Sequence, residues 1–176
     1  IMNGIEDSAR PQINGINWPS PNFRLGFIDI KGKEEIEPNS HSYYNSIEVN
    51  FVMTLLVSVL NQSTLSPISI GIITPYDAQK RMIRKTITNA YSELPESIVI
   101  VDTVDGFQGM ERDLIVFSFV RSNSGGKIGF VNDSRRINVI LTRARKGLVV
   151  IGNSECMKGN KIWKKWISFI DENNLN

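Results

Sequence analysis

Cysteine and histidine are almost absent from this sequence, in which Cys156 and His41 are the only residues of their kinds. A single cysteine excludes a disulfide within the chain and is consistent with a reducing compartment. One cysteine and one histidine also exclude a zinc site built from these two residue types. We therefore expect no metal site of this kind in the chain.

Long hydrophobic runs are absent as well. The longest apolar stretch, at residues 47–60, is interrupted by Glu48, Asn50, Thr54 and Ser58. A membrane span needs roughly 18 uninterrupted apolar residues. The first residues also lack the basic start and apolar run of a signal peptide. We expect no membrane partner and an intracellular location, in the nucleus or the cytoplasm.

A third absence is the phosphate-binding loop of nucleotide hydrolases, because the pattern G-x-x-x-x-G-K-[ST] occurs nowhere. Residues 125–127 (GGK) come nearest, but Arg121 stands where the first glycine should be and Ile128 follows the lysine. No acidic pair ends a hydrophobic strand, as a magnesium site would require, since Asp171–Glu172 falls in a predicted helix. The chain is able to complete an ATP site but not to build one.

The composition that is present is that of one globular domain. Of its 176 residues, 41% are hydrophobic and 22% are charged, both near the globular average. A chain of this length buries a core without disulfides. Its net charge of +2 neither requires nor excludes a nucleic-acid partner, so local clusters of charge must decide.

Hydrophobic periodicity predicts strands that alternate with helices. Strands are predicted at residues 24–31, 68–73, 97–104, 113–120 and 147–152. A first helix begins at a capping box of Asn45 and Glu48 and reaches Leu60. Further helices are predicted at residues 77–92, with Asp77 as N-cap, at residues 134–145, and around Trp163, Trp166, Ile167 and Ile170. Residues 1–22 are predicted to be irregular, and residues 32–42 to be a polar linker.

This alternation predicts an α/β fold with a mainly parallel sheet that helices cover on both faces. Ligands of such sheets bind outside the carboxyl ends of the strands. The rule directs attention to residues 74–79, 103–111 and 121–145.

The first of these segments places a hydroxyl and an aromatic ring directly after a strand. Thr74 is able to bond a phosphate oxygen, and Tyr76 is able to stack on a base or to pack in the core. A purely structural alternative is that Pro75 ends the strand, Asp77 caps the next helix and Tyr76 belongs to the core.

The second segment, at residues 102–113, combines two glycines with an amide and a carboxylate. Gly106 and Gly109 allow the backbone to approach a ligand closely. Gln108 and Glu111 follow, and a carboxylate is a natural acceptor for ribose hydroxyls but a poor neighbour for phosphate. The structural alternative is a tight connection between strands with solvated charges.

The third segment contains four arginines within eleven residues, at positions 135, 136, 143 and 145. Ile137, Leu141 and Ala144 follow helical spacing and are predicted to face the sheet. Guanidinium groups bind phosphate in a bidentate manner and stay charged at any working pH. An arginine that reaches a γ-phosphate from a neighbouring lobe accelerates GTP hydrolysis by roughly 10³–10⁵-fold in GTPases. The structural alternative is a solvated basic face.

Together the three segments resemble the up-frameshift and senataxin-like branch of superfamily 1 helicases. GIITPYDAQ resembles motif IV, VDTVDGFQGMERDLIVFSFVRSN resembles motif V with the strand after it, and GFVNDSRRINVILTRARKGLVVIGN resembles motif VI with its flanks. FRLGFIDIKGKEE resembles the opening strand of the second lobe, so the likeness covers residues 23–153. Met110 and Ile140 depart from the usual residues without removing a charged group.

The resemblance implies a RecA-like lobe of the P-loop NTPase type that lacks the P-loop itself, at residues 23–176. It implies that Arg143 is the catalytic arginine finger. The ATP-binding residues it implies are Gln108, Gly109, Glu111 and Arg143. The nucleic-acid-binding residues it implies are Thr74, Pro75, Thr103 and Val104.

The implied function is that of the second motor lobe of an ATP-dependent helicase that steps 5′ to 3′ along RNA. ATP with Mg²⁺ would be bound mainly by a first RecA-like lobe preceding Ile1. The partners expected are that first lobe and single-stranded RNA or DNA. The chain alone is then expected to be inactive. Two alternatives remain open: a non-catalytic module that binds nucleic acid or protein, and a lobe of a DNA helicase–nuclease.

Overall fold

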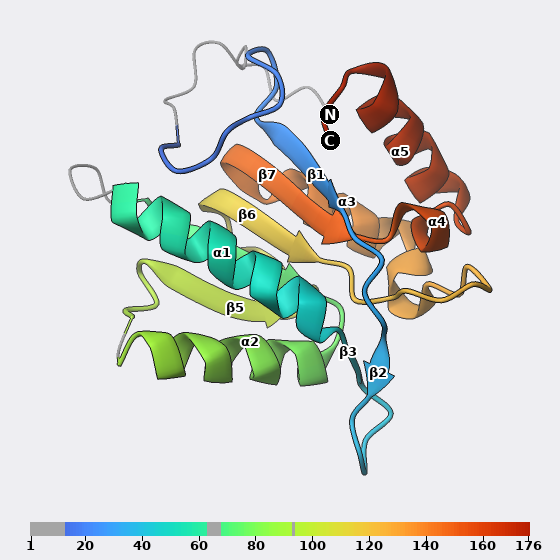
Figure 1. Ribbon diagram of the computed structural model, residues 1–176, viewed down its shortest axis with the longest axis horizontal. Coiled ribbons are helices and arrows are strands. Elements are labelled where there is room, and N and C mark those ends of the chain that lie inside the picture. The colour runs from blue at the N-terminus through green and yellow to red at the C-terminus, as the bar shows by residue number, and fades with distance from the viewer. Residues whose placement is uncertain (1–12, 63–67, 93) are drawn as a thin grey trace.

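The fold is built on a five-stranded parallel sheet with the strand order β1-β7-β6-β4-β5 (Figure 1). The computed structural model describes residues 13–62, 68–92 and 94–176. The strands of this sheet are β1 (Leu25–Asp29), β4 (Ile70–Thr74), β5 (Val99–Thr103), β6 (Arg112–Ser118) and β7 (Ala144–Gly152). The predicted α/β fold with a parallel sheet is confirmed.

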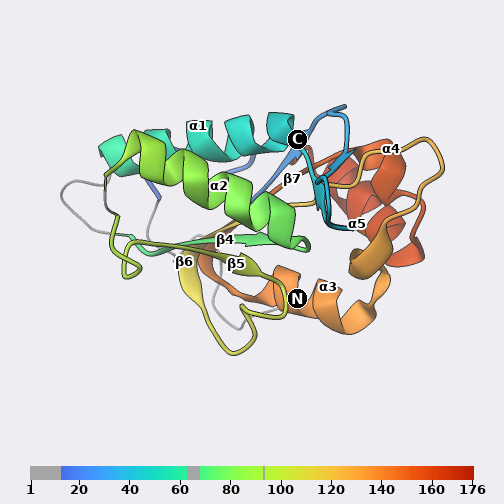
Figure 2. The same cartoon turned by 90° about the horizontal axis from the view of Figure 1, so that it is seen from below.

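Helices cover both faces of this sheet, as predicted (Figure 2). One face carries α1 (Ser46–Gln62) and α2 (Asp77–Ala90), and the opposite face carries α3 (Ser134–Thr142) and α5 (Lys161–Glu172), preceded by the short α4 (Ser154–Met157). Side chains alternate along each strand, so Leu114 and Val116 of β6 join the core under α1 and α2. Ile115 and Phe117 join the core under α3 and α5, around the fully buried Trp163.

The chain between β5 and β6 passes beneath β4, because β4 lies between these two strands in the sheet. Residues 104–111 make this crossing on the α3 face, and Phe107 is fully buried there. The ring lies so close to Gly71 of β4 that a Cβ on that glycine would stand 2.5 Å from Phe107 Cζ. Only a residue without a side chain at position 71 leaves room for the crossing.

Residues 32–42 contain more than the predicted polar linker. Strands β2 (Glu35–Ile36) and β3 (Tyr43–Tyr44) form a small antiparallel pair. Strands of two residues are too short to show an alternation of hydrophobic and polar residues, so hydrophobic periodicity does not detect them. Of the predicted irregular residues 1–22, positions 1–12 lie outside the described residues, and Ile13 is buried in the core under α1.

Two helix ends differ from the prediction. Asp77 is the first residue of α2 and not its N-cap, because the Ser42 hydroxyl accepts the hydrogen bond from the Ala78 amide. Helix α3 ends at Thr142 and not at residue 145, because Ala144 and Arg145 already belong to β7. Arg143 is therefore the C-cap residue between the two elements. Leu141 remains in the helix, whereas the pairing of Ala144 with Arg112 of β6 overrides the helical spacing at that residue.

A fully buried polar network joins α1, α2 and β6. Val120 donates its amide to both oxygens of the Glu48 carboxyl at 3.0 and 2.9 Å, and the Ser118 hydroxyl donates at 2.6 Å. The Gln79 amide donates to Ser118 at 2.9 Å and accepts from the Asn45 backbone at 2.8 Å. The predicted capping pair is present, since Glu48 donates its amide to the Asn45 side chain. Burial raises the pKa of Glu48 to about 8 despite the hydrogen bonds that oppose the shift.

We expect Gly71→Ala to destabilise the fold by about 1–3 kcal/mol, because the added methyl group would overlap Phe107 and Ile115. Gly26→Ala in β1 is the matched control, since a Cβ there meets only Pro19 at 3.9 Å. Chemical denaturation of both variants measures the difference in free energy of unfolding. Equal stability of the two variants would show that the crossing does not need a glycine.

We expect the stability of the chain to fall as pH rises from about 4.5 to about 8 through the contribution of Glu48. In that window the folded state holds a proton on Glu48 that the unfolded state releases. The slope is at most about 1.4 kcal/mol per pH unit. Glu48→Gln removes this contribution, whereas Glu172→Gln removes an exposed carboxyl and is the control. Chemical denaturation at several pH values in this range gives the free energy of unfolding of each variant as a function of pH. A slope in Glu48→Gln equal to that of the unmodified chain would contradict the assignment.

Candidate nucleotide and nucleic-acid sites

The ends of the crossing segment and of α3 meet at the amino edge of the sheet. Arg112 opens β6 and pairs with Ala144 at the start of β7. The Arg112 amide donates to the Arg143 carbonyl at 3.2 Å. Glu111 and Arg143, which precede these paired residues, are thus held side by side by the β6–β7 ladder. Gly109 has a φ of 83°, a conformation that side-chain-bearing residues rarely adopt.

The Glu111 side chain is half exposed at this edge and contacts one arginine, while a second arginine binds the Glu111 backbone. Its carboxylate lies 3.4 Å from Arg145 Nε, and the two side chains are 50% and 58% exposed. Arg112 donates to the Glu111 carbonyl at 2.9 Å. An ion pair this exposed is weak and exchanges easily with other partners. The carboxylate is therefore accessible to a hydroxyl-bearing ligand.

Like that of its neighbour Arg112, the guanidinium of Arg143 faces no carboxylate of the described residues. Its Nη2 donates to the hydroxyl of the adjacent Thr142 at 2.9 Å. Its Nε is buried and has no hydrogen-bond partner among the residues that the structure describes. By contrast, Arg136 binds Asp105 through two contacts of 2.9 and 2.8 Å. A half-buried guanidinium with an unsatisfied donor is suited to bind an external anion.

Gln108 does not join the group formed by Gly109, Glu111 and Arg143. It is exposed and lines a small cavity of about 190 Å³ with Asp133, Arg135 and Arg136 at the start of α3. Arg143 follows the other end of this helix, roughly 10 Å away along its axis. The structure thus brings together three of the four residues expected to bind nucleotide.

The residues expected to bind nucleic acid lie at the opposite, carboxyl edge of the sheet. Thr74 and Thr103 are register partners at the ends of β4 and β5, and the Val104 amide donates to the Thr74 carbonyl at 3.1 Å. Thr74 is 0% exposed and Val104 is 2% exposed, so their side chains offer no surface to a strand in this conformation. Pro75 and Thr103 are partly exposed. The interpretation of Tyr76 as a core residue also agrees with its 3% exposure.

The three motif segments were expected at one edge of the sheet, and the structure places them at two. Residues 104–111 start at the carboxyl end of β5 but finish at the amino end of β6. Helix α3 runs the same way and delivers Arg143 to the amino end of β7. Pro75 and Thr103 therefore lie at the carboxyl edge that the rule indicates, whereas Glu111 and Arg143 lie at the amino edge.

Sequence reasoning missed Arg121, which follows β6 at the carboxyl edge and is 7% exposed. Its guanidinium binds both oxygens of the Glu34 carboxylate at 3.0 and 3.1 Å and donates to the Tyr76 hydroxyl at 3.2 Å. Glu34 lies in the segment interpreted as a linker, so only the fold brings the pair together. The one local signal was an arginine directly after a buried strand.

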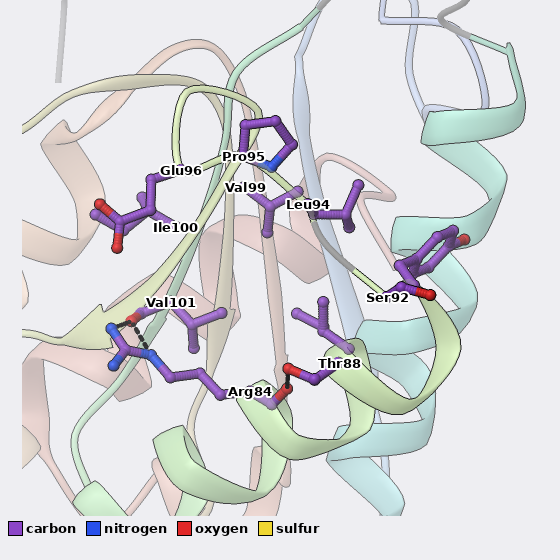
Figure 3. Close-up of a pocket in the computed structure, with 11 residues that line it drawn as sticks. Arg84, Thr88, Ser92, Leu94, Pro95, Glu96, Val99, Ile100 and Val101 are labelled. Carbon is purple, nitrogen blue, oxygen red and sulfur yellow. Dashed lines mark hydrogen bonds between the residues drawn. The ribbon is translucent and has the colours of Figure 1, made fainter.

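Another cavity, of about 650 Å³, lies between α2 and the edge strand β5 (Figure 3). Arg84 points from α2 to the strand and donates to the Val101 carbonyl at 3.1 and 2.6 Å. None of the site residues expected from the sequence lines this cavity. Arg84 thus satisfies the Val101 carbonyl of the edge strand β5, which would otherwise be open to pairing with another strand.

The described residues contain no group of three or more histidine, cysteine, aspartate or glutamate side chains that could hold a metal ion. None of the described helices is long and apolar enough to cross a membrane.

Comparison with known proteins agrees with these features. A family model described as an AAA domain matches residues 2–155. The chain is 38% identical to "Regulator of nonsense transcripts 1" of Dictyostelium discoideum, over 99% of this chain and 13% of that protein. It is 40% identical to "Helicase sen1" of Schizosaccharomyces pombe, over 86% of this chain and 9% of that protein. It is 36% identical to "ATP-dependent helicase upf1" of the same yeast, over 95% of this chain and 18% of that protein.

The chain spans between 9% and 18% of the length of the curated relatives that it matches. The family match extends over most of the chain and includes all three motif segments. The parallel sheet and the placement of these segments at its two edges fit the same assignment. The chain therefore belongs to the AAA-domain family, in the up-frameshift and senataxin-like branch of the superfamily 1 helicases.

Proposed function

We propose that this chain is the second RecA-like lobe of an ATP-dependent helicase that moves 5′ to 3′ along single-stranded RNA. Its role would be to close over an ATP and Mg²⁺ held mainly by the first lobe, and to contact the strand with its opposite edge. The observation that carries the proposal is the unsatisfied guanidinium of Arg143 beside the accessible carboxylate of Glu111.

The arginines of this lobe differ in their partners. At the amino edge Arg112 and Arg143 each keep a buried Nε without a partner among the described residues, and Arg112 donates to the Glu111 backbone carbonyl. Arg121 and Arg136 are each held by a carboxylate through two hydrogen bonds, and Arg145 is paired with Glu111. Arg143 is half-buried, makes one hydrogen bond to a hydroxyl, and keeps a buried Nε without a partner among the described residues. A γ-phosphate has the charge and the acceptor geometry to satisfy this group.

Arg143 would act on the charge that spreads over the γ-phosphoryl group during hydrolysis. A guanidinium in a half-buried position meets that charge with less screening by water than an exposed lysine would. Its backbone is fixed by the hydrogen bond from Arg112, so the side chain starts from a rigid base. Glu111 would accept hydrogen bonds from the ribose hydroxyls, after releasing its weak contact with Arg145.

Contact with the strand would come from the carboxyl edge. Pro75 and Thr103 are the partly exposed members of the four residues expected there, whereas Thr74 and Val104 support them from within. Helix α3 and residues 104–111 connect this edge to the nucleotide edge as rigid, packed elements. Closure of the lobe on ATP would therefore displace both edges together.

We expect Arg143→Ala in the full-length protein to lower the kcat of ATP hydrolysis by about 10²-fold or more, with a smaller change in KM. The loss follows from the role of an arginine finger at the transition state. Arg143→Lys should restore little activity, because an ammonium cannot bind two phosphate oxygens in the same plane.

Lys164→Ala is the matched control for this experiment, since Lys164 is an exposed cation of α5 and lies outside the three motif segments. Steady-state ATPase assays measure kcat and KM for the three variants. Turnover by Arg143→Ala equal to that of Lys164→Ala would rule out the finger role.

We expect the chain alone to hydrolyse no ATP, because it contains neither a phosphate-binding loop nor, among its described residues, a cluster of metal ligands. A phosphate-release assay on the purified chain, with the same preparation of Arg143→Ala as blank, measures this directly. Turnover above that blank would mean that the lobe builds a nucleotide site by itself.

A further inference from the structure

Three aromatic rings from distant parts of the chain meet at the carboxyl edge and line a cavity of about 600 Å³. Tyr43 comes from β3, Tyr76 precedes α2, and Phe130 lies in the 3₁₀ helix η2 (Gly129–Asn132). The ring centroids of Tyr43 and Tyr76 are 5.3 Å apart, and those of Tyr76 and Phe130 are 5.6 Å apart. The volume lies within the range of small-ligand sites.

Phe130 is held at the surface by its backbone. Its side chain is 57% exposed, although it is large and apolar. The preceding Gly129 has a φ of 61°, and a Cβ there would collide with the Tyr76 hydroxyl and the Arg121 guanidinium. The glycine therefore lets the 3₁₀ helix approach Tyr76 closely while the Phe130 ring remains open to solvent.

Two guanidinium groups also lie against these rings, and both are neutralised. Arg121 stands 4.1 Å from the centroid of Tyr43 and is paired with Glu34. Arg136 stands 5.3 Å from the centroid of Phe130 and is paired with Asp105. The hydrogen bond from Arg136 lowers the pKa of Asp105, so this carboxylate stays charged near neutral pH.

We propose that this cavity, the aromatic pocket, receives one base of the single strand, which stacks on Phe130. This inference rests on the proposed function, since it names how the same edge holds nucleic acid. A phosphate is a poor occupant, because Arg121 and Arg136 are paired with carboxylates and Asp133 also lines the pocket. A further cation is also a poor occupant, because Arg121 and Arg136 already make the cation–π contacts of Tyr43 and Phe130, although 57% of Phe130 remains exposed. A flat uncharged π-system fits the remaining surface.

The position of the pocket supports a base of the strand over a free small molecule. Pro75, one of the exposed residues expected at the strand, directly precedes Tyr76 of the pocket. Arg136 belongs to α3, which leads to Arg143, and its partner Asp105 belongs to the segment that leads to Glu111. A base stacked here would therefore lie beside Arg136 of α3, which its ion pair with Asp105 ties to the second connecting segment.

The test measures the affinity of the full-length protein for a short single-stranded RNA and for the matching DNA by fluorescence anisotropy. Phe130→Ala should weaken binding about 5-fold or more, the usual effect of removing a stacking ring. Phe130→Tyr keeps the ring and should bind like the wild type. Phe51→Ala removes an equally apolar, exposed ring of α1 and is the control. The salt dependence of binding should not change, because no unpaired cation is removed.

A second arm replaces each nucleotide of the RNA in turn by an abasic residue. One position should weaken wild-type binding as much as Phe130→Ala does, and the two changes together should add nothing further. Unchanged affinity of Phe130→Ala for both nucleic acids would overturn the inference and leave the proposed function standing. An additive effect at every abasic position would also overturn it. Failure of the wild type to bind either strand would contradict the proposed function itself.

Discussion

The packing of Phe107 beneath Gly71 is the constraint on which the arrangement of both sites depends. It holds residues 104–111 against the sheet as they cross from the carboxyl end of β5 to the amino end of β6. Helix α3 makes the same passage beside them, and the Arg136–Asp105 pair ties the two together. Because both connections are packed against one core, residues at opposite edges of the sheet belong to a single rigid unit. An ATP-driven motor needs such a link between nucleotide and strand.

The order of strands and helices could be predicted from the sequence because each element carries its own hydrophobic period. The β-branched run that became β4 is buried on both faces, whereas the run that became the edge strand β5 alternates between buried and partly buried residues. Helix α5 keeps its apolar stripe around Trp163. The ends of elements could not be predicted in the same way, since they depend on partners remote in sequence. Ser42 replaces Asp77 as the acceptor for the first amides of α2, and pairing with β6 ends α3 before Arg143.

The candidate sites likewise combine features that local sequence predicts with features that depend on contacts remote in sequence. The motif segments identified Glu111 and Arg143, but only the fold reveals that Arg143 lacks a carboxylate partner among the described residues while Arg136 has one. Burial likewise separates Thr74 from Thr103, although both follow a strand in the sequence. The aromatic pocket left no local signal, because Tyr43, Tyr76 and Phe130 come from three separate segments. Charge pairing and burial depend on contacts in the folded chain, and the hydrophobic periodicity of the sequence gives no information about either.

In the proposed function, the partly satisfied guanidinium of Arg143 completes a nucleotide site built mainly by another lobe. A structure of the intact protein with a non-hydrolysable ATP analogue and Mg²⁺ gives the decisive distance, from the Arg143 guanidinium to the terminal phosphate oxygens. We expect a distance of about 2.7–2.9 Å, with Nη2 turned away from Thr142 and toward the phosphate. A closed complex in which Arg143 stays bonded to Thr142 and another side chain meets the phosphate would contradict it.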